Sequence, residues 1–367
     1  MSKIILSGYY GFGNSGDEAI LKTIIEDLRS LKSDLDIVVL SKEPSKTSQQ
    51  LGVKSVNRYN IFRVIRHISD CDLFISGGGS LLQDNTSTRS LFYYLTLIRI
   101  ALFFRKKVML YANGVGPLKR DSSKRKVKSV LDRVSVITLR EEDSLSTLIE
   151  IGVKPSNMLV TADPVLNHSY ADKGEVDDIF DKEEIPLEAE MVGFNVREWK
   201  NISGLEDAIS GAADYLYEKY GLMALFINMS PSDRNVAERV RKKMKAPSCI
   251  LKDQYNPEQL IGIIGRMKFV IAMRLHTLIY ASIFSLPVIG LEYDPKVKGY
   301  LNYIKQTSIY DVESVKVCHL IKKIDQIMAD YEAEKQKLAK MIGAMKLQSR
   351  RNAEIAVNLL ENSKSNG

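Results

Sequence analysis

Short apolar runs alternate along most of the chain with longer segments whose apolar residues have helical spacing. In the first half, the apolar runs are Ile4–Leu6, Ile37–Leu40, Leu73–Ser76, Val108–Ala112, Val134–Leu139 and Met158–Thr161. Segments such as Glu18–Leu31 and Glu141–Ile151 between them have the length of helices. Continuous apolar runs separated by helices are typical of a parallel sheet covered on both faces, because such strands are buried on both sides.

The same alternation starts again in the second half. Its apolar runs are Val192–Val196, Ala224–Met229, Ile250–Leu251, Phe269–Ala272 and Val288–Leu291, separated by helical segments near Leu205–Tyr220, Asp233–Met244, Pro257–Met267 and Leu275–Phe284. We interpret the polar, acidic stretch Asp172–Glu190 as a linker between the halves. The charged tail Val315–Leu360 predicts one or two long helices.

The pattern therefore predicts an α/β protein of two Rossmann-like lobes facing across a cleft, followed by long C-terminal helices. We place the lobes at residues 1–171 and 172–314 and the helical segment at residues 315–367. In open parallel sheets, ligands bind beyond the carboxyl ends of the strands. The residues that follow each predicted strand are therefore the candidates for a functional site.

Composition narrows the class of protein. The chain has 367 residues, of which 45% are hydrophobic and 26% charged, with a net charge of +7. A basic balance suits nucleic acid, a membrane surface or small anionic ligands, but no nucleic-acid-binding motif is present, so we expect no nucleic-acid partner. We see no secretory signal, and three scattered cysteines make no disulfide framework, so we expect a cytoplasmic protein. The apolar stretch Leu91–Phe104 is too short to span a bilayer.

The segment GYYGFGNSGDEAIL, residues 8–21, follows the first strand and contains the G-x-G-x-x-G spacing of a dinucleotide-binding turn. Asp17 and Glu18 lie directly after the last of these glycines, where a pyrophosphate would need the helix N-terminus. Two carboxylates there would repel it, which disfavours a dinucleotide. We instead expect the side chains of this loop to bind sugar hydroxyls, and the candidates are Asn14, Ser15, Asp17 and Glu18. The alternative is that Ser15 or Asp17 only caps the helix.

A second glycine turn, Gly77–Ser80, follows the strand Leu73–Ser76. Glycines allow a backbone to come close to a ligand, so Gly78 and Gly79 are candidates for acceptor binding, together with Asp84 a few residues later. The alternative is a tight turn without a ligand. Carboxylates and amides suit a neutral, hydroxyl-rich ligand better than one rich in phosphate.

Basic residues follow the strands of both halves. Arg274 and His276 come after one strand, and Lys296 and Arg197 after two others, while Arg140 follows a strand of the first half. Arginine holds carboxylates and phosphates through two parallel hydrogen bonds, and histidine exchanges protons near neutral pH. The set therefore favours a small, multiply charged anion that undergoes acid–base chemistry, although any one of these residues alone is more often structural.

At these residues the sequence resembles the polysaccharide pyruvyl transferase family. The motifs that carry the resemblance are GYYGFGNSGDEA, ISGGGSLLQD, TLRE, MRLHTL and EYDPK, in that order over roughly the first 300 residues. The resemblance is greatest to the bacterial enzymes that add a ketal-linked pyruvate to a secondary cell-wall polysaccharide, the tag that S-layer homology domains bind.

The resemblance implies a GT-B-like fold and the transfer of pyruvate from phosphoenolpyruvate to a terminal N-acetylmannosamine of a lipid-linked polysaccharide precursor. It implies a donor site that includes His276, Lys296 and Arg140, to which we add Arg274 and Arg197, with His276 and Arg274 as the catalytic pair. Neither a metal nor a cofactor is expected.

A lipid-linked acceptor would bring the protein to the cytoplasmic face of the inner membrane. The segments Leu91–Lys107 and Lys119–Arg133 are candidates for contact with anionic headgroups. The alternatives are a buried helix with a basic end for the first segment and a solvated helix face for the second.

Two other functions stay open from the sequence. A sugar-nucleotide-dependent glycosyltransferase of the same fold would need an acidic residue for the ribose, and Glu292 suits that role. A non-catalytic carbohydrate-binding protein of the envelope is disfavoured by the lack of a secretory signal and by the His–Arg–Lys set.

Overall fold

The computed structural model describes residues 2–85, 87–199, 203–309 and 312–361, which form two compact units. The first unit contains residues 1–168 and 345–367, and the second contains residues 169–344. The division lies close to the predicted boundary after residue 171, and the predicted helical segment 315–367 is shared between the two units.

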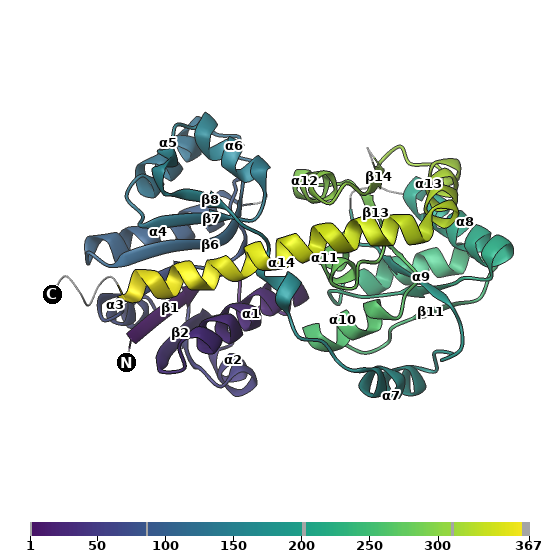
Figure 1. Cartoon of the computed structure of the whole chain (residues 1–367), viewed down its shortest axis with the longest axis horizontal. Helices are drawn as coiled ribbons and strands as arrows, with labels where there is room; N and C mark the ends of the chain where they lie inside the picture. The colour runs from purple at the N-terminus through teal and green to yellow at the C-terminus, as the bar shows by residue number, and fades with distance from the viewer. Residues whose placement is uncertain (1, 86, 200–202, 310–311, 362–367) are drawn as a thin grey trace. The chain divides into compact units, whose positions relative to one another are not determined.

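The first unit is built on a parallel sheet with strand order β3-β2-β1-β4-β6-β7-β8, and β5 pairs with the end of β6 (Figure 1). The strands are β1 (Ser2–Ser7), β2 (Leu35–Ser41), β3 (Lys54–Asn57), β4 (Leu73–Ser76), β5 (Gly79–Leu82), β6 (Lys107–Val115), β7 (Val136–Leu139) and β8 (Met158–Val160). The helices between them are α1 (Ser15–Leu31), α2 (Pro44–Leu51), α3 (Ile61–Ser69), α4 (Thr88–Phe103), α5 (Asp121–Leu131) and α6 (Glu142–Glu150). The strand order reverses direction between β1 and β4, so this edge is the switch point where ligands bind in such sheets.

The second unit has a parallel sheet with strand order β11-β10-β9-β12-β13-β14, which reverses between β9 and β12. Its strands are β9 (Met191–Asn195), β10 (Met223–Phe226), β11 (Ser248–Ile250), β12 (Val270–Ala272), β13 (Val288–Leu291) and β14 (Thr307–Ile309). Its helices are α7 (Lys173–Glu183), α8 (Ser203–Tyr220), α9 (Asp233–Lys243), α10 (Pro257–Gly265), α11 (Leu275–Ile283), α12 (Pro295–Tyr303) and α13 (Val317–Ala329).

The last helix, α14 (Tyr331–Glu361), begins in the second unit and ends in the first. Within the first unit, the amide of Asn352 accepts a hydrogen bond from the Thr161 hydroxyl at 2.9 Å, and the Leu359 carbonyl accepts one from Lys107 at 2.7 Å. The tail is thus part of the packed structure of that unit.

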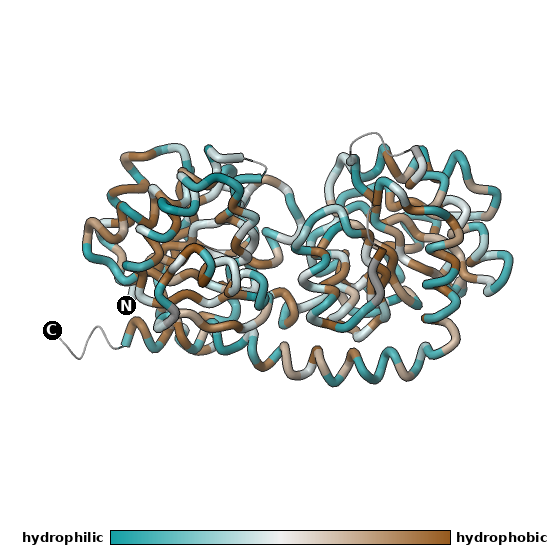
Figure 2. Tube along the Cα trace, turned by 90° about the horizontal axis from the view of Figure 1, so that it is seen from above, coloured by the Kyte–Doolittle hydropathy of each residue, from teal (hydrophilic) through white to brown (hydrophobic). Residues whose placement is uncertain are grey.

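The α/β fold with parallel sheets and a long C-terminal helix confirms the fold class read from the apolar pattern. The hydropathy colouring of Figure 2 shows hydrophobic segments gathered inside each unit and hydrophilic ones on its outside. The strands are buried because helices cover both faces of each sheet, which is the reason for their continuous apolar sequences. Among the residues that the structure describes, no helix is long and apolar enough to cross a membrane.

The prediction that Asp172–Glu190 is a linker is wrong, because this stretch contains the helix α7. The Asp172 carboxylate caps it by accepting a hydrogen bond from the Glu175 backbone at 3.0 Å. Val176, Ile179 and Phe180 are buried along one face. Most of the acidic residues lie on the solvent side of this amphipathic helix, although Glu183 is buried. The apolar stripe is short, so the charged residues around it obscure the helical pattern in the sequence.

Asp27, near the end of α1, predicts a pH-dependent stability. Burial raises the pKa of Asp27 to about 7, Glu26 adds to the rise, and Arg350 of α14 offsets part of it. The folded pKa of Asp27 exceeds the unfolded value of about 4. Below about pH 4 the carboxyl is protonated in both states and does not destabilise the folded protein. As the pH rises from about 4 to about 7, the unfolded chain loses this proton more readily than the folded one, so the folded state is progressively destabilised. We expect Asp27→Asn to raise the melting temperature at pH 8 and to have little effect at pH 4.5. Asp178→Asn, at an exposed site on α7, is the control, and an equal effect at both pH values would contradict the assignment.

Candidate functional site

Both glycine turns of the sequence analysis lie at the switch point of the first unit. The loop after β1 leads into α1, and the turn Gly77–Gly79 joins β4 to β5. Asn14 caps α1 by accepting a hydrogen bond from the Gly16 backbone at 3.2 Å, so the expected alternative caps, Ser15 and Asp17, do not fill that role.

The glycine loop already holds a carboxylate of its own chain. Glu18 accepts a hydrogen bond from the Gly11 backbone at 2.9 Å, and the backbone N–H groups of Phe12 and Gly13 also donate to it. Burial raises the pKa of Glu18, and these hydrogen bonds offset part of the rise. A nest of successive N–H groups is the usual receptor for a phosphate, and here Glu18 occupies it. This arrangement is further reason to reject a dinucleotide at the loop.

Asp17 lies against the second glycine turn. A Cβ on Gly79, whose φ is +93°, would lie 3.1 Å from a carboxylate oxygen of Asp17. A Cβ on Gly78 would lie 3.0 Å from Ile20 of α1. The two glycines therefore allow the first turn of α1, with Asp17 and Ser15, to approach the β4–β5 turn closely.

Asp84 has a structural role in this unit. Its carboxylate accepts hydrogen bonds from the backbone of Lys119 at 2.7 Å and of Arg120 at 3.1 Å, at the start of α5. Burial would raise the pKa of Asp84, but these bonds and one from Ser123 lower it below its usual value. The side chain thus fixes the two residues that precede α5, whose cap residue Arg120 makes no capping hydrogen bond of its own.

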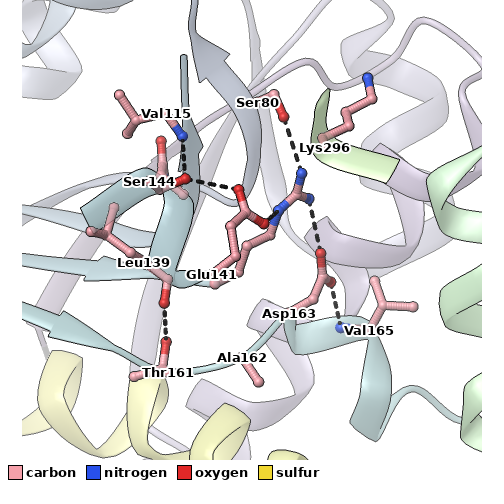
Figure 3. Close-up of polar contacts among 12 residues, drawn as sticks. Ser80, Val115, Leu139, Glu141, Ser144, Thr161, Ala162, Asp163, Val165 and Lys296 are labelled. Atoms are coloured by element: carbon pink, nitrogen blue, oxygen red, sulfur yellow. Dashed lines mark hydrogen bonds and ion pairs between the residues drawn. The ribbon is translucent and has the colours of Figure 1, made fainter. Parts of the chain in front are cut away.

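Arg140 is buried between two carboxylates. Figure 3 shows Glu141, Asp163 and Ser80 around its guanidinium, to which they lie at 2.8, 3.0 and 3.0 Å. Burial alone would lower the pKa of Arg140, but the two carboxylates raise it above its usual value. The guanidinium is therefore charged and its charge is compensated inside the protein. Glu141 in turn accepts a hydrogen bond from Ser144, whose hydroxyl binds the Val115 backbone in Figure 3.

In the second unit, Arg274 joins the loops at the switch point. It donates to Asp233 through two hydrogen bonds of 2.7 and 2.6 Å, and its backbone N–H donates to Asn195 at 3.2 Å. Asn195 also donates to Asp233 at 3.3 Å and to the carbonyl of Ile227 at 2.9 Å. This buried network ties together the carboxyl ends of β9, β10 and β12.

His276 lies two residues after Arg274, in the first turn of α11, where its side chain is half-buried. The segment that carries it is fixed on one side by the Arg274 network and on the other by the apolar residues of α11. Leu278, Ile279 and Tyr280 are fully buried. The Arg274 network and the buried face of α11 therefore hold the imidazole at the carboxyl end of β12.

Arg197 and Lys296 differ from the two paired arginines. Arg197 donates to the Tyr293 hydroxyl at 3.1 Å and lies 5.0 Å from the centre of that ring, so these contacts leave its charge uncompensated. Lys296 is the second residue of α12, its ammonium lies 3.7 Å from Asp294, and its side chain is 32% exposed. Both cations are therefore better suited than Arg140 or Arg274 to receive an anion from solution.

The structure thus brings Arg197, Arg274, His276 and Lys296 to the ends of three neighbouring strands, β9, β12 and β13. The sequence reasoning missed Asn195 and Asp233, although Asn195 is the last residue of an apolar strand and Asp233 opens a helix. Within the described residues, no group of three or more His, Cys, Asp or Glu side chains is placed to hold a metal ion.

Comparisons with known proteins agree with this architecture. S. aureus MnaA, solved with UDP, has a TM-score of 0.65 at 13% identity, with 98% of each chain covered. Anabaena HepE, solved with UDP-glucose, has a TM-score of 0.63 at 12% identity over the whole of both chains. At such low identity these likenesses establish the fold alone, which is GT-B-like.

The sequence comparisons are more specific. The amylovoran biosynthesis protein AmsJ of Erwinia amylovora is 23% identical over 401 residues, which cover 93% of this chain and 95% of AmsJ. The model of the polysaccharide pyruvyl transferase family matches residues 14–295. This chain therefore belongs to the polysaccharide pyruvyl transferase family and is a transferase of polysaccharide biosynthesis.

Proposed function

We propose that the protein transfers pyruvate from phosphoenolpyruvate to the terminal sugar of a lipid-linked cell-wall polysaccharide precursor. The terminal sugar is N-acetylmannosamine, and the product is a cyclic ketal of the kind used for S-layer anchoring. The observation that carries the proposal is the grouping of His276, Arg197 and Lys296 at the switch point of the second sheet. A cationic site beside an imidazole suits a substrate with a carboxylate and a phosphate.

The reaction begins with protonation of the methylene carbon of phosphoenolpyruvate, which makes the adjacent carbon cationic. A sugar hydroxyl attacks that carbon and loses its proton. The bond to the phosphate oxygen then breaks, phosphate leaves, and a second hydroxyl attacks and loses its proton to close the ketal. The two hydroxyl protons balance the one gained by the methylene carbon and the one carried away by phosphate.

In this proposal His276 moves protons, and Lys296 and Arg197 bind the carboxylate and phosphate of the donor. Arg274 holds the segment that carries His276 through Asp233. For Arg140, whose charge two carboxylates compensate, we propose a supporting role within the first unit, where it joins Glu141, Asp163 and Ser80.

On the acceptor side we propose Asp17 and Ser15, with Gly78 and Gly79 providing the close approach of the backbone. Asn14, Glu18 and Asp84 are occupied with the helix cap, the glycine loop and the start of α5, and they support this surface.

The second candidate is a sugar-nucleotide-dependent glycosyltransferase. One observation favours it: Glu292, directly after β13, has a buried carboxylate oxygen without a hydrogen-bond partner among the described residues. Such an oxygen is suited to accept a hydrogen bond from a ribose hydroxyl. The absence of turnover with phosphoenolpyruvate, together with turnover of a UDP-sugar, would establish this candidate instead.

The test is release of phosphate from phosphoenolpyruvate in the presence of a disaccharide glycoside that ends in N-acetylmannosamine. We expect release that depends on this acceptor and is unchanged by EDTA, with mass spectrometry showing a pyruvylated product. Acceptors ending in galactose or glucose test the terminal sugar. Failure of every acceptor, with full-length folded protein, would overturn the proposal.

A membrane-bound acceptor adds an arm to this test. The aromatic ring of Phe92 in α4 lies 3.9 Å from the ammonium of Lys126 in α5, and Phe103 at the end of α4 is exposed. Basic and aromatic side chains together suit an anionic lipid surface. We expect the protein to sediment with vesicles that contain phosphatidylglycerol and to stay in solution with purely zwitterionic ones; equal behaviour would remove the membrane contact.

A further inference from the structure

Two aromatic rings lie stacked in the loop after β1. The rings of Tyr9 and Phe12 have centroids 4.0 Å apart and an angle of 6° between their planes. Tyr9 is 39% exposed, whereas Tyr10, the next residue, is fully buried. The stack therefore presents a flat aromatic surface at the switch point of the first sheet.

The outward direction of Tyr9 is fixed by the packing of Tyr10. A Cβ on Gly8 would lie 2.2 Å from the Tyr10 ring, and one on Gly77 would lie 1.9 Å from its hydroxyl. Only glycine at both positions leaves room for Tyr10 inside the unit. Gly8 and Tyr9 form a bend after β1, and Tyr10 is held inside the unit while Tyr9 lies at the surface.

The buried side chain of Arg58 packs against the Phe12 ring of this stack. Arg58, which follows β3, is 6% exposed and donates to the carbonyl of Gly8 at 2.9 Å and to the Tyr94 hydroxyl at 3.3 Å. Its guanidinium lies 5.1 Å from the centre of the Phe12 ring and 4.5 Å from that of Tyr93. The Nε of Arg58 has no hydrogen-bond partner among the described residues. Burying a cation against aromatic rings and neutral oxygens, without a carboxylate, costs folding free energy. Through these contacts Arg58 holds the loop after β1 in place.

The Asp17 carboxylate lies near the Tyr9 side of the stack. Burial raises the pKa of Tyr9, and the nearby Asp17 carboxylate adds to the rise. Tyr59, 65% exposed, lies 5.8 Å from Arg58 and extends the aromatic surface. A pyranose ring has a matching character, because its C–H groups form an apolar face and its hydroxyls project from the rim.

We propose that the Tyr9–Phe12 stack is the platform on which a pyranose ring of the saccharide acceptor lies, with Asp17 accepting a hydrogen bond from a hydroxyl at the rim. This inference rests on the proposed function and adds aromatic side chains to the polar and glycine residues proposed above for the acceptor surface. Tyr9 contacts the sugar, and Arg58 is a positioning residue that acts through the loop.

Tyr9→Ala tests the platform. We expect the KM for the disaccharide glycoside ending in N-acetylmannosamine to rise about tenfold or more, with the KM for phosphoenolpyruvate unchanged. Tyr9→Phe keeps the ring and should stay near the original value. Tyr217→Ala removes a tyrosine of similar exposure from α8 and is the matched control.

A direct binding measurement separates this inference from the reaction. Saturation-transfer NMR with the same glycoside, without donor, should show ring-face protons in contact with the protein, and Tyr9→Ala should abolish the signal. If the glycoside binds in this way but no phosphate is ever released, the proposed function fails and the platform stands. An unchanged acceptor KM in active Tyr9→Ala would overturn the platform, as would a Tyr9-dependent NMR signal from the base of UMP and none from the glycoside.

Discussion

Replacing His276 with glutamine is expected to lower the turnover number by about 10²–10⁴-fold, which is the range that general acid–base catalysis contributes. Glutamine keeps a hydrogen-bonding side chain of similar reach but cannot exchange a proton near neutral pH. Because the imidazole is half-buried in the first turn of α11 and its neighbours Leu278 and Ile279 hold the helix in place, the fold should be retained.

The measurement is phosphate release at saturating phosphoenolpyruvate and acceptor, with circular dichroism to verify the fold. His67→Gln, on α3 of the first unit, is the matched control and should keep full activity. A loss confined to the KM for phosphoenolpyruvate would make His276 a binding group. A turnover number near that of the unchanged protein would remove it from the proton transfers.

Most strands were predictable from their apolar runs, including the edge strand β8, whereas the edge strands β3 and β14 were not. β1, β4 and β6 lie inside their sheet and are continuous apolar runs. β3, with the sequence Lys-Ser-Val-Asn, is an edge strand in which Val56 alone is buried. β14 is one edge of the second sheet and is shorter still, with three residues. An edge strand needs fewer apolar residues, so its sequence carries little of the signal that identifies its neighbours.

The position of the candidate site residues was predictable because topology alone brings strand ends together. The sequence could not show which of these basic side chains are paired with a buried carboxylate. Asp163 is 23 residues from Arg140, and Asp233 is 41 residues from Arg274. These pairs form through the fold and leave no local pattern. Arg58 was missed for the same reason, since its aromatic partners come from separate segments.

The buried cluster around Arg140 gives the largest expected change in stability. In Arg140→Met, Asp163 and Glu141 stay beside each other without the cation, at sites where the Asp163 side chain is 3% exposed and that of Glu141 12%. Removing one partner of a buried ion pair costs about 3–5 kcal/mol, because the remaining charge is desolvated and uncompensated. The control is Lys182→Met, which breaks an ion pair with Asp253 whose side chains are 66% and 53% exposed. It should cost less than about 1 kcal/mol.

Two further measurements identify the cause of that loss. Burial already raises the pKa of Asp163 above its unfolded value, and Arg140 offsets part of that rise. Without the guanidinium the pKa rises further, so the folded variant keeps a proton over a wider pH range than the unfolded chain does. The cost of Arg140→Met should therefore be larger at pH 8 than at pH 5 in urea denaturation. Adding Asp163→Asn should recover part of the stability at pH 8, since it removes one of the buried charges. If Arg140→Met were as mild as Lys182→Met, or if Asp163→Asn made it less stable still, the cluster would not be the electrostatic support of this strand edge.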